Sequence, residues 1–396
     1  MQRRNFLTAA MLSLLAGRAL AAPRKPAPKK KTPPKTAKKP SGPTARSADA
    51  PVIDRPPDGS SASRLPPVRP PEPPAEWQTH EITTRIQLRR PSGPTRLWLP
   101  LPLNHDLYQR TVGHRWSSNA AQAGMRRLPD GELELFFAEW KNGEDPRLEL
   151  TTTVSTADRM FDITKRTVAP EREDILRRNL QATTLIPNDG PAHELGQRIV
   201  GRIKDPVAQA KAVYDWIIER AIYSPDLSAS GSGDLRKQLA QGQYGGRSVD
   251  INGLFVALCR AIGIPARLVF GLRVGNSRLF KCLGVSNENA TQSQHCRAEF
   301  YIPGYGWIPV DPSDVRRAIA LEGLSDRDNR LASLKRVLFG VWEMNWIAYN
   351  VGLDFRLPGS QNQERLPFFT LPRLENGEGS DPTTPEFSIQ TKRVEL

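Results

Sequence analysis

Residues 245–267, GGRSVDINGLFVALCRAIGIPAR, pass from a glycine turn into a stretch whose apolar residues have helical spacing. These residues recur three, four and seven positions apart, as one face of a helix requires: Ile251, Leu254, Phe255, Leu258 and Ile262. Gly263 and Pro265 then interrupt the pattern, so we expect a helix from about Ser248 to Ile262. The next residues, ARLVFGLRV, have the composition of a strand.

Ser248 stands where this helix begins. Backbone N–H groups in the first turn have no partner within a helix, and the positive end of the helix dipole lies beside them. A nucleophile at that point would have its anionic form favoured, and the free amides could hold an oxyanion. Serine is also a common helix cap, so the residue alone leaves both roles open.

Residues 294–314, QHCRAEFYIPGYGWIPVDPSD, predict a β-hairpin that reverses at Pro303–Gly306. The reversal would bring His295 and Asp311 to the same end of the hairpin, and a symmetric register would place them on one face. An aspartate beside a histidine fixes the imidazole tautomer and stabilises the imidazolium that forms during attack. Together with Ser248, the pair would supply a nucleophile, a base and an orienting group.

The two stretches together resemble the transglutaminase-like core of the papain-type superfamily, over about residues 190–315. The resemblance implies an α+β fold and a Cys-His-Asp triad that forms a thioester with an amide substrate and passes the acyl group to an amine or to water. His295 and Asp311 match the histidine and aspartate of that family. The cysteine position lies fifteen residues before Gly263, where this chain has Ser248.

The chain has three cysteines, and none is expected to replace the missing nucleophile. Cys259 lies about 16 Å along the same helix, at ~1.5 Å per residue. Cys296 follows His295 on a strand and should face the opposite side. Cys282 lies in a loop that could border the cleft, but no helix is expected to begin there. No CxxC pair or calcium-binding acidic loop is present, so we expect no metal and no cofactor.

Serine in the cysteine position leaves two functions open. A cysteine thiol can become a resting thiolate, whereas serine needs the imidazole to take its proton as attack proceeds. The first function is an exported hydrolase or acyltransferase that acts on amide or ester bonds through Ser248, His295 and Asp311. The second is a pseudoenzyme that binds a peptide or cell-wall polymer through the retained cleft. In both cases the partner is a peptide, protein or cell-wall amide.

The N-terminal part of the chain has the features of an exported protein. Residues 1–21 resemble a twin-arginine signal peptide with a small-x-small cleavage pattern at Ala19–Ala21, which implies a periplasmic or otherwise exported location. Residues 22–76 hold sixteen of the 36 prolines and many lysines, so we expect a disordered tether. No later segment is long and apolar enough to predict a transmembrane span.

The net charge of +14 is concentrated in these two segments. They carry +3 and +7, which leaves only +4 for the residues from Trp77 onward. A nearly balanced globular part gives no support to a basic groove for nucleic acid.

Short runs with period-2 alternation from residue 77 to 165 predict an antiparallel β-sandwich domain. They include HEITTRIQLRR, TRLWLPLPL, ELELFFAEW and RLELTTTVSTADR. His80, His105 and His114 are scattered through this region without matching partners, so we expect packing or surface roles for them. The fold class is therefore α+β, with the papain-like transglutaminase core at residues 171–320 preceded by this sandwich.

Residues 321–396 are expected to form a C-terminal extension that packs on the core. Within it, Trp342, Trp346 and Tyr349 have the spacing of one helical face, which predicts a packed helix.

Overall fold

The structure is a computed structural model that describes residues 74–395 except 90, 106, 129–132, 162–167, 228–229, 286 and 378. The predicted signal peptide lies outside the described residues, as does nearly all of the predicted tether. Within the described part of the chain, no helix has both the length and the apolar character that crossing a membrane requires.

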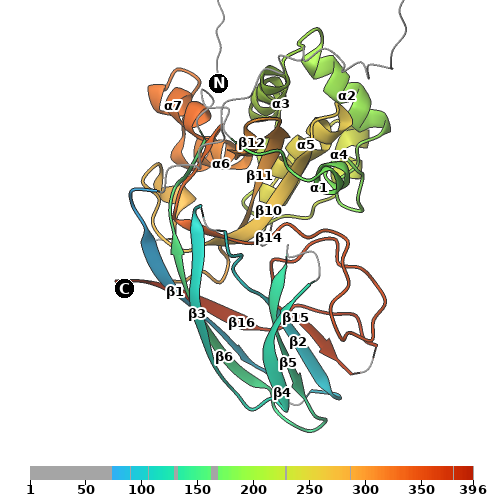
Figure 1. The fold of residues 1–396 in the computed structure, drawn as a ribbon, viewed down its shortest axis with the longest axis vertical. Coiled ribbons are helices and arrows are strands. Elements are labelled where there is room, and N and C mark those ends of the chain that lie inside the picture. The colour runs from blue at the N-terminus through green and yellow to red at the C-terminus, as the bar shows by residue number, and fades with distance from the viewer. Residues whose placement is uncertain are drawn as a thin grey trace, which may run out of the picture. The chain divides into compact units, whose positions relative to one another are not determined.

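Two antiparallel four-stranded sheets form the predicted sandwich (Figure 1), in the orders β16-β1-β6-β3 and β15-β2-β5-β4. The bounds are β1 (Gln78–Gln87), β2 (Thr95–Pro100), β3 (Gln109–Ser118), β4 (Gln122–Arg127), β5 (Glu134–Trp140), β6 (Arg147–Thr156), β15 (Arg373–Asn376) and β16 (Phe387–Val394). Buried side chains of both sheets meet between them, including Leu97, Phe136, Trp140 and Leu148. The four quoted alternating runs correspond to β1, β2, β5 and β6, whereas β15 and β16 come from the C-terminal segment, outside the predicted bounds of residues 77–165.

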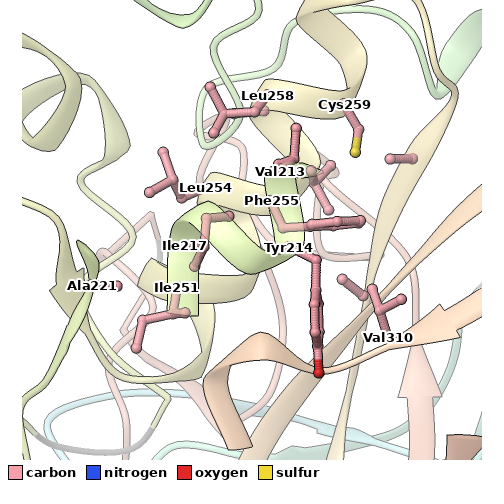
Figure 2. Close-up of a cluster of buried hydrophobic side chains, with 14 of the residues drawn as sticks. Val213, Tyr214, Ile217, Ala221, Ile251, Leu254, Phe255, Leu258, Cys259 and Val310 are labelled. Carbon is pink, nitrogen blue, oxygen red and sulfur yellow. The ribbon is translucent and has the colours of Figure 1, made fainter. Parts of the chain in front are cut away.

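Seven α-helices and a short 3₁₀-helix lie in the described part of the core. They are α1 (Glu173–Arg178), α2 (Gly190–Val200), α3 (Pro206–Arg220), α4 (Leu235–Gln241), α5 (Ser248–Ala261), η1 (Lys281–Leu283), α6 (Pro312–Glu322) and α7 (Asn329–Val337). Every residue of α5 is buried, which makes it the central helix. Figure 2 shows Val213, Tyr214 and Ile217 of α3 packed against Ile251 and Phe255 of α5.

The core sheet has the strand order β12-β11-β10-β14 and is antiparallel throughout. Its strands are β10 (Ala266–Arg273), β11 (Gln294–Ile302), β12 (Gly306–Val310) and β14 (Trp346–Asn350). Helix α5 packs on β10 and β11. Cys296, Ala298 and Phe300 join the hydrophobic cluster that contains α5. Because side chains alternate along a strand, His295 faces the other side of the sheet.

Four short strands complete the described elements: β7 (Arg159–Met160), β8 (Ile222–Tyr223), β9 (Gly245–Gly246) and β13 (Val341–Trp342). β8 pairs with β9 in parallel, directly before α5, and β7 pairs with β13. The mixture of helices with antiparallel sheets confirms the predicted α+β class.

The hairpin of β11 and β12 forms as predicted, but its register differs by two residues. Ala298 pairs with Val310, whereas a register symmetric about His295 and Asp311 would pair Ala298 with Ile308. The reason is the turn, which is centred on Gly304 with φ 84°. A shift of two residues preserves the face of every side chain, so His295 and Asp311 still lie on one side.

The helix predicted around Trp342 is wrong, because this segment forms strands β13 and β14. A spacing of four residues fits one face of a helix and one face of a strand equally well. Trp346 packs with Trp342, while Tyr349 belongs to a different cluster on the other face of β14. β14 joins the core sheet and β15 and β16 join the sandwich, so the C-terminal segment contributes to both.

Glu299 on β11 forms a buried ion cluster with two arginines. Its carboxylate binds Arg159 of β7 and Arg267 of β10, and the residue is only 1% exposed. Burial alone would raise the pKa of Glu299, but the two guanidinium charges outweigh burial and lower the pKa to about 2. The cluster therefore stabilises the fold only while the carboxylate is ionised.

Glu299→Gln should lower the free energy of unfolding by about 3–5 kcal/mol, because it leaves two buried guanidinium groups without their carboxylate. Denaturant unfolding at pH 7 measures the loss. The matched control is Glu149→Gln, whose pair with Arg85 is about half exposed and should contribute about 1 kcal/mol or less. The Glu299 contribution should be complete above the unfolded pKa of about 4.5 and disappear as the pH falls toward 2. Equal losses in the two variants would contradict this account.

Candidate active site

Ser248 is the first residue of α5, and the start of that helix is fixed by the Asp250 carboxylate. The carboxylate accepts hydrogen bonds from the backbone N–H groups of Arg247, at 2.8 Å, and Gly233, at 2.7 Å. Gly246 has φ 128°, and a Cβ there would lie 2.3 Å from an Asp250 oxygen. Only glycine therefore allows the chain to approach Asp250 this closely before it enters α5.

The Ser248 side chain contacts backbone groups. Its Oγ accepts a hydrogen bond from the N–H of Cys296, at 3.1 Å, and donates one to the carbonyl of Ser230, at 3.5 Å. Among the described residues, Oγ has no hydrogen bond to a ring nitrogen of His295, so the Ser–His contact that a poised triad requires is not made. The N–H of Val249 also binds the Ser230 carbonyl, whereas the N–H of Ser248 has no described acceptor.

His295 and Asp311 are brought together as a buried pair. His295 Nε2 lies 2.7 Å from Asp311 Oδ2, and the two residues are 4% and 0% exposed. Asp311 is also the N-cap of α6, where Oδ1 accepts from the N–H of Asp314 at 3.0 Å. A neutral imidazole that donates through Nε2 keeps a lone pair on Nδ1, so Nδ1 is the atom that can accept a proton.

Asn252 is a buried residue of this site that the sequence analysis did not find. Its Nδ2 donates to Asp311 Oδ1, at 3.0 Å, and to the carbonyl of Cys296, at 2.8 Å. Its Oδ1 accepts from the N–H of Ser313, at 3.1 Å. The only signal in the sequence was its position four residues after Ser248, on the same face of α5.

Two buried arginines balance the carboxylates around His295. Arg273 Nη2 lies 2.5 Å from Asp314 Oδ1, and Arg297 Nε lies 3.5 Å from Asp311 Oδ2. Asp314 Oδ1 is also 3.5 Å from His295 Nε2. Burial alone would raise the pKa of Asp314, but Arg273 and the other nearby cations hold it well below the ordinary value. Neither arginine could be linked to the site from the sequence, because each pair joins separate elements.

The pKa of His295 lies below its ordinary value of 6.5. Burial is the main cause, since it disfavours the imidazolium, and the Arg273 charge acts in the same direction. Asp314 and Asp311 oppose these effects without cancelling them. The imidazole is therefore neutral at pH 7, as a general base must be before it accepts a proton.

His295, Asp311 and Asp314 together offer three donor atoms within 4.8 Å of one another, which is close enough to hold a metal ion. Both carboxylates already contact a guanidinium group, from Arg273 and Arg297. A cation would have to displace these charges, so this donor set does not suit a metal.

The carbonyl of His295 is held by Trp346, whose Nε1 donates to it at 2.9 Å. The indole ring passes so close to Gly271 that a Cβ there would lie 2.4 Å from a ring atom. The bulge between β10 and β14 occurs at Phe270 and Gly271. Gly271 thus lets Trp346 reach across β10 and fix the backbone that carries the histidine.

Ser248 and His295 line one small polar cavity of about 40 Å³. The other lining residues are Tyr223, Arg247, Arg273, Gly284, Gln292, Ser293, Gln294, Ser313 and Arg317. Such a volume has space for a few water molecules or one small polar group. The cavity therefore suits the reacting part of a substrate.

None of the three cysteines is among the residues that line this cavity. Cys259 and Cys296 are buried, and burial raises the pKa of both thiols. Cys282 lies in η1, where burial first and Glu322 second raise its pKa to about 12. A thiol in that state is a poor nucleophile at neutral pH.

Comparison with known proteins gives a family match over the part of the chain that holds this site. Residues 193–312 match the model of the transglutaminase-like superfamily. An uncharacterized protein of Haemophilus influenzae is 32% identical over 318 residues, which cover 75% of this chain and 86% of the relative.

Two solved structures are more distantly similar. A candidate cysteine protease from Cytophaga hutchinsonii is 17% identical and has a TM-score of 0.47, over 80% of this chain and 99% of its own. The periplasmic domain of TgpA from Pseudomonas aeruginosa is 16% identical and has a TM-score of 0.34, over 63% of this chain and 93% of its own.

His295 should titrate below pH 6.5, and Asp314→Asn should lower its pKa further, because the variant removes a negative charge that favours the imidazolium. NMR titration of ¹⁵N-labelled histidine measures both values. Asp215→Asn is the control, since Asp215 pairs with Lys211 on the surface of α3 and should leave His295 unchanged. A His295 pKa at or above 6.5, or an increase in Asp314→Asn, would show that this electrostatic account is wrong.

Proposed function

Because the chain belongs to the transglutaminase-like superfamily, we propose that it hydrolyses or transfers the acyl group of amide bonds in peptides or proteins. The observation that carries this proposal is the 2.7 Å hydrogen bond between His295 and Asp311, next to a cavity that Ser248 shares with His295. A buried carboxylate that orients an imidazole is the arrangement that activates a hydroxyl nucleophile.

In the proposed reaction, Ser248 Oγ attacks the amide carbon while His295 Nδ1 takes its proton. The new C–O bond displaces an electron pair onto the carbonyl oxygen, where the Ser248 N–H and the positive end of α5 would stabilise it. Collapse of this intermediate breaks the C–N bond, and His295 returns the proton to the departing amine. Water or a second amine then attacks the ester, which completes hydrolysis or acyl transfer. Asp311 stabilises the imidazolium in both halves.

Attack requires Ser248 to change hydrogen-bond partners. Its Oγ must leave the Cys296 N–H and the Ser230 carbonyl and turn toward His295 Nδ1. Catalytic hydrogen bonds are commonly long in free enzymes and become short once substrate binds.

The contacts of Ser248 also support a second candidate function, that of a pseudoenzyme. A hydroxyl bound to two backbone groups has a structural role already, without any transfer of protons. In that case the cavity would bind a peptide or a cell-wall polymer without turnover.

A fluorophosphonate probe separates the two functions. In an active enzyme, Ser248 displaces fluoride and forms a stable phosphonyl ester, so wild type should be labelled and Ser248→Ala should not. Amide or ester hydrolysis should fall at least ~10³-fold in Ser248→Ala. Ser333→Ala, at an exposed position of α7, is the control and should retain full labelling. An unlabelled wild type, with acyl transfer only in Ser248→Cys, would support the pseudoenzyme instead.

We further propose that residues 1–21 direct export through the twin-arginine route and that residues 22–76 tether the folded part. The paired Arg3–Arg4 and the small residues at 19–21 support this proposal. Replacing both arginines by lysine in the full chain should retain the uncleaved protein in the cytoplasm. Cell fractionation with mass spectrometry measures location and cleavage together. Unchanged export of the double-lysine variant would contradict a twin-arginine route.

A further inference from the structure

Arg247 and Arg317 flank Tyr223 in the wall of the cavity that contains Ser248. The guanidinium carbons lie 5.8 Å and 5.4 Å from the centre of the tyrosine ring. Arg317 also donates to the tyrosine hydroxyl. Arg247 directly precedes Ser248, and Arg317 lies on α6, the helix that Asp311 caps. Two positive charges thus stand beside the atom proposed to attack the substrate.

Neither of these arginines has a carboxylate partner among the described residues. Arg247 donates to the carbonyls of Leu227, at 2.6 Å, and Pro225, at 3.4 Å. Arg317 Nε donates to the carbonyl of Cys282, at 2.7 Å. This distinguishes the pair from the other two guanidinium groups near His295, each of which contacts an aspartate.

The nearest carboxylate to Arg247 in sequence, that of Asp250, is already engaged. It accepts from two backbone N–H groups and from the hydroxyl of Ser232. Burial is the main cause that lowers the pKa of Arg247, and the charges of Arg317 and Arg273 act in the same direction, whereas Tyr223 and Asp250 oppose them. Two half-buried cations that repel each other and form no ion pair with a carboxylate among the described residues are stabilised by an external anion.

Gln294, another residue of the cavity wall, has one buried acceptor atom without a hydrogen bond to any described residue. Gln294 is 3% exposed, and its Nε2 donates to the carbonyl of Thr291 at 3.0 Å. Its Oε1 is buried and accepts no hydrogen bond. A buried acceptor without a donor is costly, and a substrate N–H that reached this oxygen would offset the cost.

We propose that the acyl substrate carries a carboxylate, held by Arg247 and Arg317, on the residue next to the amide bond that is cleaved. The position of the carboxylate next to a cleaved amide bond rests on the proposed function, whereas the binding of a carboxylate by the two arginines does not. The planar fork of a guanidinium group matches a carboxylate with paired hydrogen bonds. Both arginines line the cavity that contains Ser248, so a carboxylate that they bind lies next to the reacting group. The ligand is therefore an acidic residue or a free chain end of a peptide.

The test compares two peptide p-nitroanilides that differ only in aspartate or asparagine next to the scissile bond. For wild type, kcat/KM should favour the aspartate peptide by about 10- to 100-fold, as expected for a charge-assisted hydrogen bond. In Arg317→Gln and in Arg247→Gln this ratio should fall to about 1–3. Arg317→Lys should keep part of the preference, because it keeps the charge without the fork.

Arg316→Gln is the matched control, since Arg316 is the neighbour on α6 and its guanidinium binds the carbonyl of Ile218 outside the cavity. It should keep the wild-type ratio. Circular dichroism and thermal unfolding report whether each variant folds. If Arg247→Gln does not fold, the two Arg317 variants carry the test, because the described hydrogen bonds of Arg317 go to Cys282 and Tyr223 and not to α5.

Competition experiments with other carboxylate peptides identify the source of the carboxylate. An acidic peptide with a free carboxyl end that competes better than its C-terminal amide would assign the chain end, and equal competition by the two would assign the acidic side chain. Inorganic phosphate that competes as strongly as the carboxylate peptides would overturn the carboxylate assignment.

Failure of the reaction and failure of this inference give different results. Hydrolysis without any preference for aspartate would overturn the inference and leave the proposed function standing. If wild type shows no turnover, calorimetry with the same two peptides replaces kinetics. Tighter binding of the aspartate peptide that is lost in Arg317→Gln would then support the inference without catalysis, and equal binding of both peptides would overturn it.

Discussion

The Asp311 carboxylate is the group on which the arrangement of the site depends. One oxygen holds His295, and the other caps α6 and accepts from Asn252 of α5. A single buried carboxylate therefore fixes a strand and two helices relative to one another. It can do so because Arg297 lies near its charge and because each oxygen has a hydrogen-bond donor, which offsets the cost of burying an ion. Any loss of this group would disturb the histidine and the helix carrying Ser248 together.

Charge compensation divides the arginines of the site into two kinds. Arg273 and Arg297 are buried and lie against Asp314 and Asp311, so they belong to the internal balance of the fold. Arg247 and Arg317 contact only neutral groups among the described residues, although they lie in the same cavity wall. The first kind makes a metal ion unfavourable beside His295, and the second kind makes an anion favourable beside Ser248. Arginine thus has a structural role where it is fully buried against an aspartate, and it is available to a ligand where it is half-buried and has no such partner.

The sequence predicted those features that depend on local spacing. The apolar period gave α5 and placed Ser248 at its start, and the hairpin pattern brought His295 to the end that carries Asp311. Residues such as Arg273 and Asp314, which lie on different elements and have no shared motif, could not be paired in advance. The Trp342 segment was predicted wrongly for a physical reason, since a four-residue spacing does not distinguish a strand from a helix. One contact of Ser248 is with the carbonyl of Ser230, which lies in a loop whose path cannot be predicted from a local sequence pattern.

The pKa of His295 bears on whether Ser248 is an active nucleophile or only occupies the place of a lost cysteine. A cysteine enzyme of the papain type keeps a thiolate beside an imidazolium, and the negative charge of the thiolate itself favours the protonated histidine. Around His295 the balance of burial, Arg273 and the two aspartates lowers that pKa. A neutral imidazole is what a hydroxyl nucleophile requires, because the base must be free to accept a proton during attack. A lowered pKa therefore suits oxygen at position 248, but it also follows from burial in any site that lacks the thiolate charge, so it is common to the active serine and to the pseudoenzyme.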